Sequence, residues 1–272
     1  MFPPHRPSNP SDDFKGLSAL QFQRVSTPGS HYDKVGQSPG QYKEVDQNGE
    51  PRTFESMEGV ISKETLKALT QSPYKFKNMT PVQAAVFDYL PPLSDSHDSK
   101  APSEESRTPP PDLLVKAKTG TGKTAAFMIP AIEQRVNVLE AFGEQALKDS
   151  GLSKLKFNMS RVVRNFAREN AGVLVISPTR ELASQIAKEA SNLAYHQKDL
   201  HVQLFIGGSS RHQQMRQWMT SRRDIVVATP GRLRDVLNEP EVKNAFSKTS
   251  LVFNFLRSQY HPANPPSVVG RA

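Results

Sequence analysis

Residues 117–124 read A-K-T-G-T-G-K-T, and this stretch decides the fold. The apolar run at 112–117 predicts a short parallel strand, and residues 124–129 have the composition of a helix start. A glycine-rich turn between such a strand and helix lets backbone N–H groups point at phosphate oxygens. We therefore predict a phosphate-binding loop for a nucleoside triphosphate. The alternative is an ordinary Gly/Thr-rich turn in another αβ unit.

Within this loop the residue types suit ATP and Mg²⁺. Lys123 is expected to reach the β- and γ-phosphates, and the Thr124 hydroxyl to ligate Mg²⁺, so these two are the catalytic candidates. Ala117 stands where the motif usually begins with glycine. The expected nucleotide contacts in the loop are Lys118, Thr119, Gly120, Thr121, Gly122, Lys123 and Thr124.

Outward from the loop, apolar runs alternate with amphipathic ones. Helices are predicted at 62–69, 80–89 and 181–195, and further strands at 173–176, 202–206, 224–228 and 251–253. This order predicts an α/β fold: a RecA-like P-loop domain with a parallel sheet and helices on both faces. Ligands of such sheets bind at the carboxyl ends of the strands.

Composition limits the remaining possibilities. The chain has 272 residues, 36% of them hydrophobic, with 22 Pro, no Cys and a net charge of +8. The Pro-rich and polar segment 1–52 is predicted to be a disordered arm, with the domain at 53–253 and insertions near 91–111 and 143–170, the second carrying a basic helix. The absence of Cys fits an intracellular protein, with mitochondrion, nucleus and cytoplasm all open. No membrane span, no transition-metal site and no oligomer is expected.

Four further motifs lie around the loop in a fixed order. They are F-K-N-M-T-P-V-Q at 76–83, P-T-R-E-L-A at 178–183, G-G at 207–208 and T-P-G-R-L at 229–233. Together they resemble the first RecA-like domain of the DEAD-box RNA helicases, over roughly residues 54–253. The resemblance implies sequence-nonspecific binding of single-stranded or structured RNA through its sugar-phosphate backbone. The residues implied are Thr179, Arg180, Gly208, Thr229, Gly231 and Arg232.

The resemblance also assigns adenine recognition. Gln83 matches the glutamine of the family's Q motif, and its amide can both donate to and accept from the adenine edge. Phe76, or the more distant Phe54, would cover the adenine ring, although either ring could simply fill the core. Two further residues are expected to be structural: Glu181 as an interior partner of Arg232, and Trp218 as a core residue.

The carboxylates that the family uses for hydrolysis are not found where they are expected. Asn254 stands where the first Asp of the Asp-Glu-Ala-Asp segment should follow the strand at 251–253, and no Asp or Glu occurs after Glu241. The Pro-rich tail 254–272 does not resemble the family, which is the pattern of a retained intron, a displaced splice junction or a frameshift. We therefore expect a C-terminally incomplete RecA-like domain that binds ATP and RNA weakly at most.

Two other functions stay open. The first is a non-catalytic remnant that binds ATP or RNA, or an artefact of the gene model. The second is an unrelated P-loop kinase or DNA translocase, and Gln83 and the 178–183 motif disfavour it. The wording M-T-P-V-Q at 79–83 and the long segment after residue 90 give a faint similarity to fungal mitochondrial members of the family.

Overall fold

The computed structural model describes residues 22–24, 51–90, 113–115, 117, 120–153, 156, 158–247, 249 and 251–254. The predicted insertion at 91–111, residues 255–272 of the predicted tail, and Lys118 and Thr119 lie outside these residues. Most of the arm predicted to be disordered lies outside them as well. Three of its residues, however, form a strand, β1 (Phe22–Arg24). The proposed domain limits of 53 and 253 stay a prediction.

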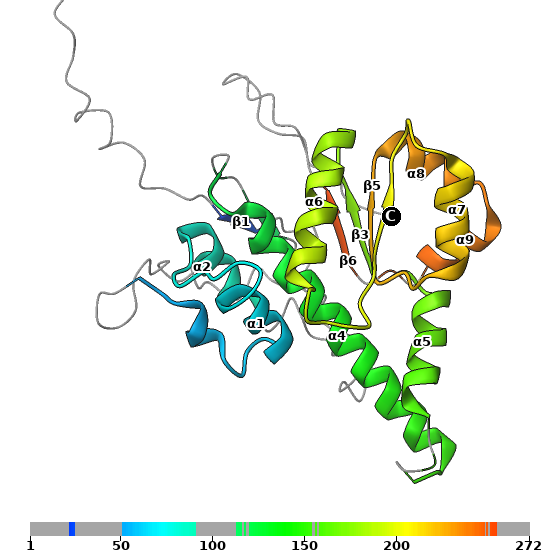
Figure 1. The fold of residues 1–272 in the computed structure, drawn as a ribbon, viewed down its shortest axis with the longest axis horizontal. Coiled ribbons are helices and arrows are strands. Elements are labelled where there is room, and N and C mark those ends of the chain that lie inside the picture. The colour runs from blue at the N-terminus through cyan, green and yellow to red at the C-terminus, as the bar shows by residue number, and fades with distance from the viewer. Residues whose placement is uncertain are drawn as a thin grey trace, which may run out of the picture.

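The centre of the fold is a four-stranded parallel sheet (Figure 1). Its order is β4-β5-β3-β6, with β3 at Val173–Ile176, β4 at Val202–Phe205, β5 at Ile225–Ala228 and β6 at Leu251–Asn254. All three pairings are parallel and in register, so that Ile176 lies beside both Ala228 and Asn254. The predicted strands are thus confirmed to within a residue at each end.

Alternate side chains of the sheet pack into two apolar clusters, one on each face. Val173, Val175 and Val227 face the larger cluster, whereas Val226 and Ala228 face the smaller one. Helices α1 (Lys63–Thr70), α2 (Pro81–Phe87), α4 (Lys123–Ser150) and α6 (Arg180–Leu193) supply the first cluster. Helices α7 (Arg211–Thr220), α8 (Pro230–Val236) and α9 (Pro240–Phe246) supply the second. The predicted coverage of both faces is confirmed.

The helices begin where a side chain can cap them. Ser62, Thr80, Thr179 and Ser210 each accept a hydrogen bond from a backbone N–H of the first turn that follows. A short 3₁₀ helix, η2 (Phe54–Met57), precedes α1. The three helices predicted from periodicity therefore lie within two residues of their predicted ends. Within the described residues, no helix is long and apolar enough to cross a membrane.

One strand differs from its prediction. β2 (Leu113–Val115) was expected to pair in a parallel direction, but it pairs antiparallel with β1, with Phe22 opposite Val115. In the described part of the chain it takes no place in the larger sheet, although Leu113 and Val115 still pack against the main core. Three residues form few ladder hydrogen bonds, so the available partner decides the pairing, and antiparallel pairs are slightly more stable per residue.

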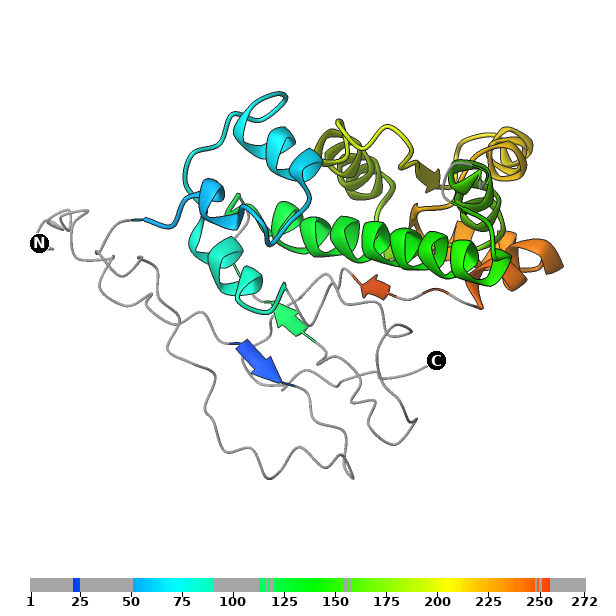
Figure 2. The same ribbon diagram turned by 90° about the horizontal axis from the view of Figure 1, so that it is seen from below.

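Helix α4 continues far beyond the sheet. With α5 (Met159–Glu169) it forms a helical hairpin that extends past one end of the sheet (Figure 1), and Figure 2 shows the full length of α4. The basic helix predicted within 143–170 is confirmed as α5, but Gly143 itself lies inside α4 rather than at the start of a separate segment.

Candidate functional site

The predicted phosphate loop leads directly into α4. Gly122 caps that helix in the left-handed conformation with φ of 77°, and Gly120 has φ of 79°. Both values favour glycine because a Cβ is strained there. The first N–H groups of a 28-residue helix therefore face the loop, which is the arrangement that binds phosphate. A Cβ built on Gly120 would meet nothing within 4 Å, so this side of the loop leaves room for a ligand.

Lys123 and Thr124 occupy the first turn of α4, as the sequence predicted. The Lys123 ammonium donates to the carbonyl of Ala117 at 2.7 Å, which closes the loop upon itself. Burial lowers the pKa of Lys123. Thr124 is half-buried at the same turn, where a hydroxyl can reach a cation held by phosphates.

Gln83 lies against the phosphate loop. Its Oε1 accepts from the Thr80 backbone N–H at 2.8 Å, and its Nε2 donates to the Gly122 carbonyl at 3.3 Å. The Thr80 hydroxyl donates to the Thr121 carbonyl at 2.9 Å, so the start of α2 is bound to the loop at two points. A Cβ on Gly122 would come within 2.6 Å of Gln83 Nε2. Gln83 thus positions the loop, a role that the sequence did not assign to it.

The two candidate adenine-stacking rings lie in different environments. Phe54 is completely buried in the main core, so the core alternative holds for it and it has no face to offer a ligand. Phe76 is 40% exposed and stacks on Tyr74, with ring centroids 4.8 Å apart. The ring of Phe54 stacks against that of Phe76, with ring centroids 6.1 Å apart. We therefore keep the stacking role for Phe76 alone.

The predicted RNA-contacting residues gather at the carboxyl ends of β3, β5 and β4, because these strands are parallel neighbours. The Ser177 N–H donates to the Ala228 carbonyl and the Thr229 N–H donates to the Phe205 carbonyl, which binds the three loops to one another. Thr229 is buried and Arg232 is half-buried, whereas the other four residues are exposed. We call the set the rim: Thr179, Arg180, Gly208, Thr229, Gly231 and Arg232.

Within the rim, Arg180 lies close to the glycine pair that follows β4. A Cβ on Gly208 would come within 2.6 Å of Arg180 Nη1, and Gly208 has φ of 83°. Thr179 caps α6 by accepting from the Leu182 N–H at 3.2 Å. Capping and ligand binding are compatible here, because the helix start leaves other N–H groups exposed.

Arg232 is fixed by partners that the sequence did not indicate. It donates to Gln214 Oε1 at 2.8 Å and to the Ser209 carbonyl at 3.1 Å. Gln214 in turn donates to the Ile206 carbonyl at 3.0 Å. The expected Glu181 partnership is wrong: Glu181 is exposed on α6 and accepts from Gln185 instead. No sequence signal identifies Gln214, since a polar residue within a helix is usually solvated.

Asn254 at the end of β6 lies beside Ile176, at the carboxyl ends of the strands. Asn254 is exposed, and an amide carries no charge for a cation. Across the described ranges, no three His, Cys, Asp or Glu residues gather into a group that could hold a metal ion. The role of Thr124 as a ligand for Mg²⁺ stays a prediction.

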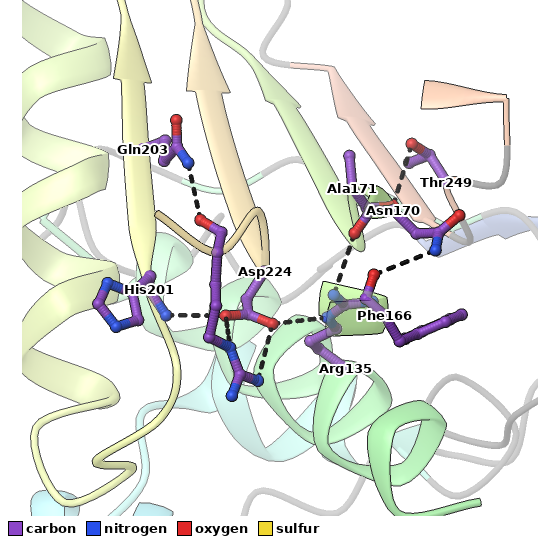
Figure 3. Close-up of polar contacts among 9 residues, drawn as sticks. Arg135, Phe166, Asn170, Ala171, His201, Gln203, Asp224 and Thr249 are labelled. Carbon is purple, nitrogen blue, oxygen red and sulfur yellow. Dashed lines mark hydrogen bonds and ion pairs between the residues drawn. The ribbon is translucent and has the colours of Figure 1, made fainter. Parts of the chain in front are cut away.

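The amino ends of the same strands carry a buried ion cluster (Figure 3). Asp224, completely buried, accepts from Arg135 Nε and Arg222 Nε, both at 2.9 Å, and from the His201 N–H at 3.0 Å. Gln203 Nε2 closes the cluster on the Arg222 carbonyl. Burial lowers the pKa of Arg135, while Asp224 acts in the opposite direction. We call these five residues the base.

Trp218 is a core residue, as predicted. It is completely buried on α7 and packs against Phe205 and Phe246, with centroids 5.4 and 5.5 Å away. The Arg223 guanidinium covers its ring at 4.2 Å. A buried ring of this kind is unavailable for stacking on a nucleobase of RNA.

Comparisons with known proteins agree with the geometry. Residues 105–253 match the DEAD/DEAH box helicase family. The chain is 33% identical over 206 residues to the mitochondrial ATP-dependent RNA helicase MSS116 of Phaeosphaeria nodorum, covering 75% of this chain and 30% of the relative. It is 36% identical over 186 residues to human ATP-dependent RNA helicase DDX18, covering 68% and 21%. The crystal structure of the yeast DEAD-box splicing factor Prp28 has the same fold, with a TM-score of 0.51 at 21% identity over 82% of this chain and 49% of that one.

Proposed function

The chain belongs to the DEAD/DEAH box helicase family, and on that premise we propose that it binds ATP at the phosphate loop and one RNA strand at the rim. As part of an ATP-dependent RNA helicase, these sites would couple ATP hydrolysis to duplex remodelling. The observation that carries the proposal is the joining of the loops after β3, β5 and β4 at one end of the sheet, which is also the end where Asn254 lies.

ATP would be held by the start of α4 and the residues around it. The backbone N–H groups of residues 120–123 would point at a phosphate, and Lys123 would exchange the Ala117 carbonyl for a phosphate oxygen. Mg²⁺, when bound, would neutralise phosphate charge, and the Thr124 hydroxyl would ligate it. Phe76 would cover the adenine ring.

Gln83 would recognise adenine with the groups that the loop leaves it. A side-chain amide has two N–H donors and two lone pairs on oxygen, and one of each is used by Gly122 and Thr80. The remaining donor and lone pair match the N7 and N6 groups of adenine. Gln83→Ala should therefore loosen the loop and also reduce the preference for ATP over GTP.

RNA would be held by its backbone. Arg180 and Arg232 supply guanidinium groups, Thr179 and Thr229 supply hydroxyls, and the glycines expose N–H groups. Such groups contact phosphate and ribose without reading nucleobases, so binding should tolerate any sequence.

We also propose an intracellular location, which the lack of Cys supports.

We infer that these 272 residues turn ATP over weakly or not at all. Hydrolysis requires an acidic residue to hold Mg²⁺ from the second side, and Asn254 stands at that strand end. The second candidate function is accordingly a non-catalytic ATP- and RNA-binding module.

The deciding experiment is phosphate release from Mg·ATP, with and without single-stranded RNA, compared with Lys123→Ala. We expect release no greater than that of the control, together with measurable binding of ATP and RNA. RNA-stimulated release that disappears in Lys123→Ala would refute the inference of weak turnover. Asn254→Asp tests the reason: it should tighten Mg·ATP by about 1 kcal/mol, as expected for a partly exposed charge pair. Binding of neither ATP nor RNA would refute the proposed function itself.

A further inference from the structure

The α4–α5 hairpin is a well-packed element that the proposed function does not use. Phe142 on α4 stacks on Phe166 on α5, with ring centroids 4.0 Å apart. Gly143 lets the helices approach closely, since a Cβ there would lie 3.1 Å from Val163 and 3.2 Å from Met159. Asn158 caps α5 by accepting from the Arg161 N–H at 3.0 Å. The hairpin therefore holds the outer face of α5 in a fixed position.

That outer face carries a row of arginines. Arg161, Arg164 and Arg168 follow the spacing i, i+3, i+7, so they lie on one side of the helix, opposite Val163 and Phe166. All three side chains are exposed. Within the described ranges, no ion pair joins any of them to a carboxylate. Arg168 donates to the Thr220 carbonyl at 2.9 Å, which fixes the end of the row against α7. We call Arg161, Arg164 and Arg168 the arginine row.

The arginine row lies far from the rim. α5 ends just before β3 begins, whereas the rim follows the opposite ends of β3, β4 and β5. In Figure 1, α5 extends past the end of the sheet that is remote from α8. A ligand of the arginine row therefore does not compete with a strand held at the rim.

We propose that the arginine row is a second RNA-binding surface, which takes the phosphate backbone of the same RNA outside the rim. The choice of RNA rests on the proposed function; the choice of surface rests on the row itself. Guanidinium groups bind phosphate in a bidentate manner, and no carboxylate of the described residues forms an ion pair with these three. The face between the arginines offers Asn165 and no large apolar side chain, whereas a protein partner would require an apolar centre.

The test variant is Arg161→Gln/Arg164→Gln, because Arg168 also holds α7. The matched control is Lys63→Gln/Lys67→Gln, which removes two exposed charges from α1. Affinity for a long single-stranded RNA is measured by fluorescence anisotropy over a series of salt concentrations. For single strands, each lost phosphate contact makes the negative slope of log affinity against log salt less steep by about 0.7. The slope should therefore be less steep by about 1.4 in the test variant, which loses two contacts, and unchanged in the control. Circular dichroism checks that both variants are folded.

Arg180→Ala, measured alongside, separates this inference from the proposed function. A test variant that matches its control while Arg180→Ala weakens binding overturns the inference and leaves the proposed function standing. A lowered slope in the test variant with no effect of Arg180→Ala supports the arginine row and contradicts the rim. Polyglutamate that displaces RNA from the wild type as well as unlabelled RNA does would overturn the choice of RNA in favour of an acidic protein.

Discussion

The base and the rim lie at opposite ends of the same strands and differ in nearly every physical property. At the base, Asp224 is completely buried and accepts hydrogen bonds from two guanidinium groups and a backbone N–H. At the rim, Arg180 and Gly208 are exposed, while Arg232 is held by the Gln214 side chain and the Ser209 carbonyl. Only the four residues of β5 separate Asp224 from Thr229. The same sheet can therefore be anchored at the amino ends of its strands and still lead into exposed loop residues at the carboxyl ends.

The largest effect is expected at the base. Asp224→Ala leaves Arg135 and Arg222 buried without their carboxylate, which should cost about 3–5 kcal/mol of unfolding free energy. Urea unfolding measures this loss. Asp235→Ala is the control, because the Asp235 side chain is 47% exposed and its pairs with Arg211 and Arg232 are long, at 3.3 and 3.7 Å, so they should be worth at most about 1 kcal/mol. Equal losses in the two variants would contradict the difference between base and rim.

At the rim the effect should fall on binding. Arg180→Ala removes an exposed guanidinium and should change stability by less than about 0.5 kcal/mol. If Arg180 contacts phosphate, RNA affinity should fall by about 1.5–3 kcal/mol, as for hydrogen bonds to charged groups. Titration of labelled RNA measures this, with Lys188→Ala on the same helix as the control. A large loss of stability would show that Arg180 belongs to the framework.

A smaller effect should follow from the glycine beside Arg180. Gly208→Ala places a Cβ at φ of 83°, which costs about 1–2 kcal/mol, and displaces the Arg180 guanidinium. We therefore expect a modest loss of stability together with weaker RNA binding. Gly59→Ala is the control, since it places a Cβ at φ of 80° outside the rim, where nothing lies within 4 Å. Unchanged RNA affinity in Gly208→Ala would mean that the position of Arg180 is not critical.

The smallest effect concerns a buried carboxylate away from both ends. Glu133 on α4 accepts from the Ser62 N–H at 2.7 Å and from the Ser62 hydroxyl at 2.9 Å, and burial raises its pKa above the ordinary value of 4.5. The folded state thus binds this proton more tightly than the unfolded state does. Stability should be highest below the unfolded pKa and fall as pH rises through the raised value.

Unfolding midpoints measured over a pH series test this, and Glu133→Gln should remove that part of the dependence. The glutamine keeps one acceptor for Ser62 and loses the charge. An unchanged pH profile in the variant would show that Glu133 is charged in the folded protein at the same pH as in the unfolded one.

Local patterns determined much of the molecule. Alternating apolar runs placed β3, β4, β5 and β6 to within a residue, because buried parallel strands need continuous apolar side chains. Capping residues fixed the starts of α1, α2 and α6, because each cap bonds a backbone N–H only three residues further along the chain. The rim was predictable too, since parallel strands bring their carboxyl ends together whatever their separation in the chain.

The sequence by itself thus determined the strands, the helix starts, the phosphate loop and the family. Only the tertiary structure decided that β2 pairs antiparallel with β1, that Phe54 is buried while Phe76 is exposed, that Gln83 binds the Gly122 carbonyl, and that Asp224 joins Arg135 across 89 residues. The physical reason is range. Periodicity and capping are settled by neighbours within a few residues, whereas pairing partners and burial depend on segments that meet only when the chain has folded.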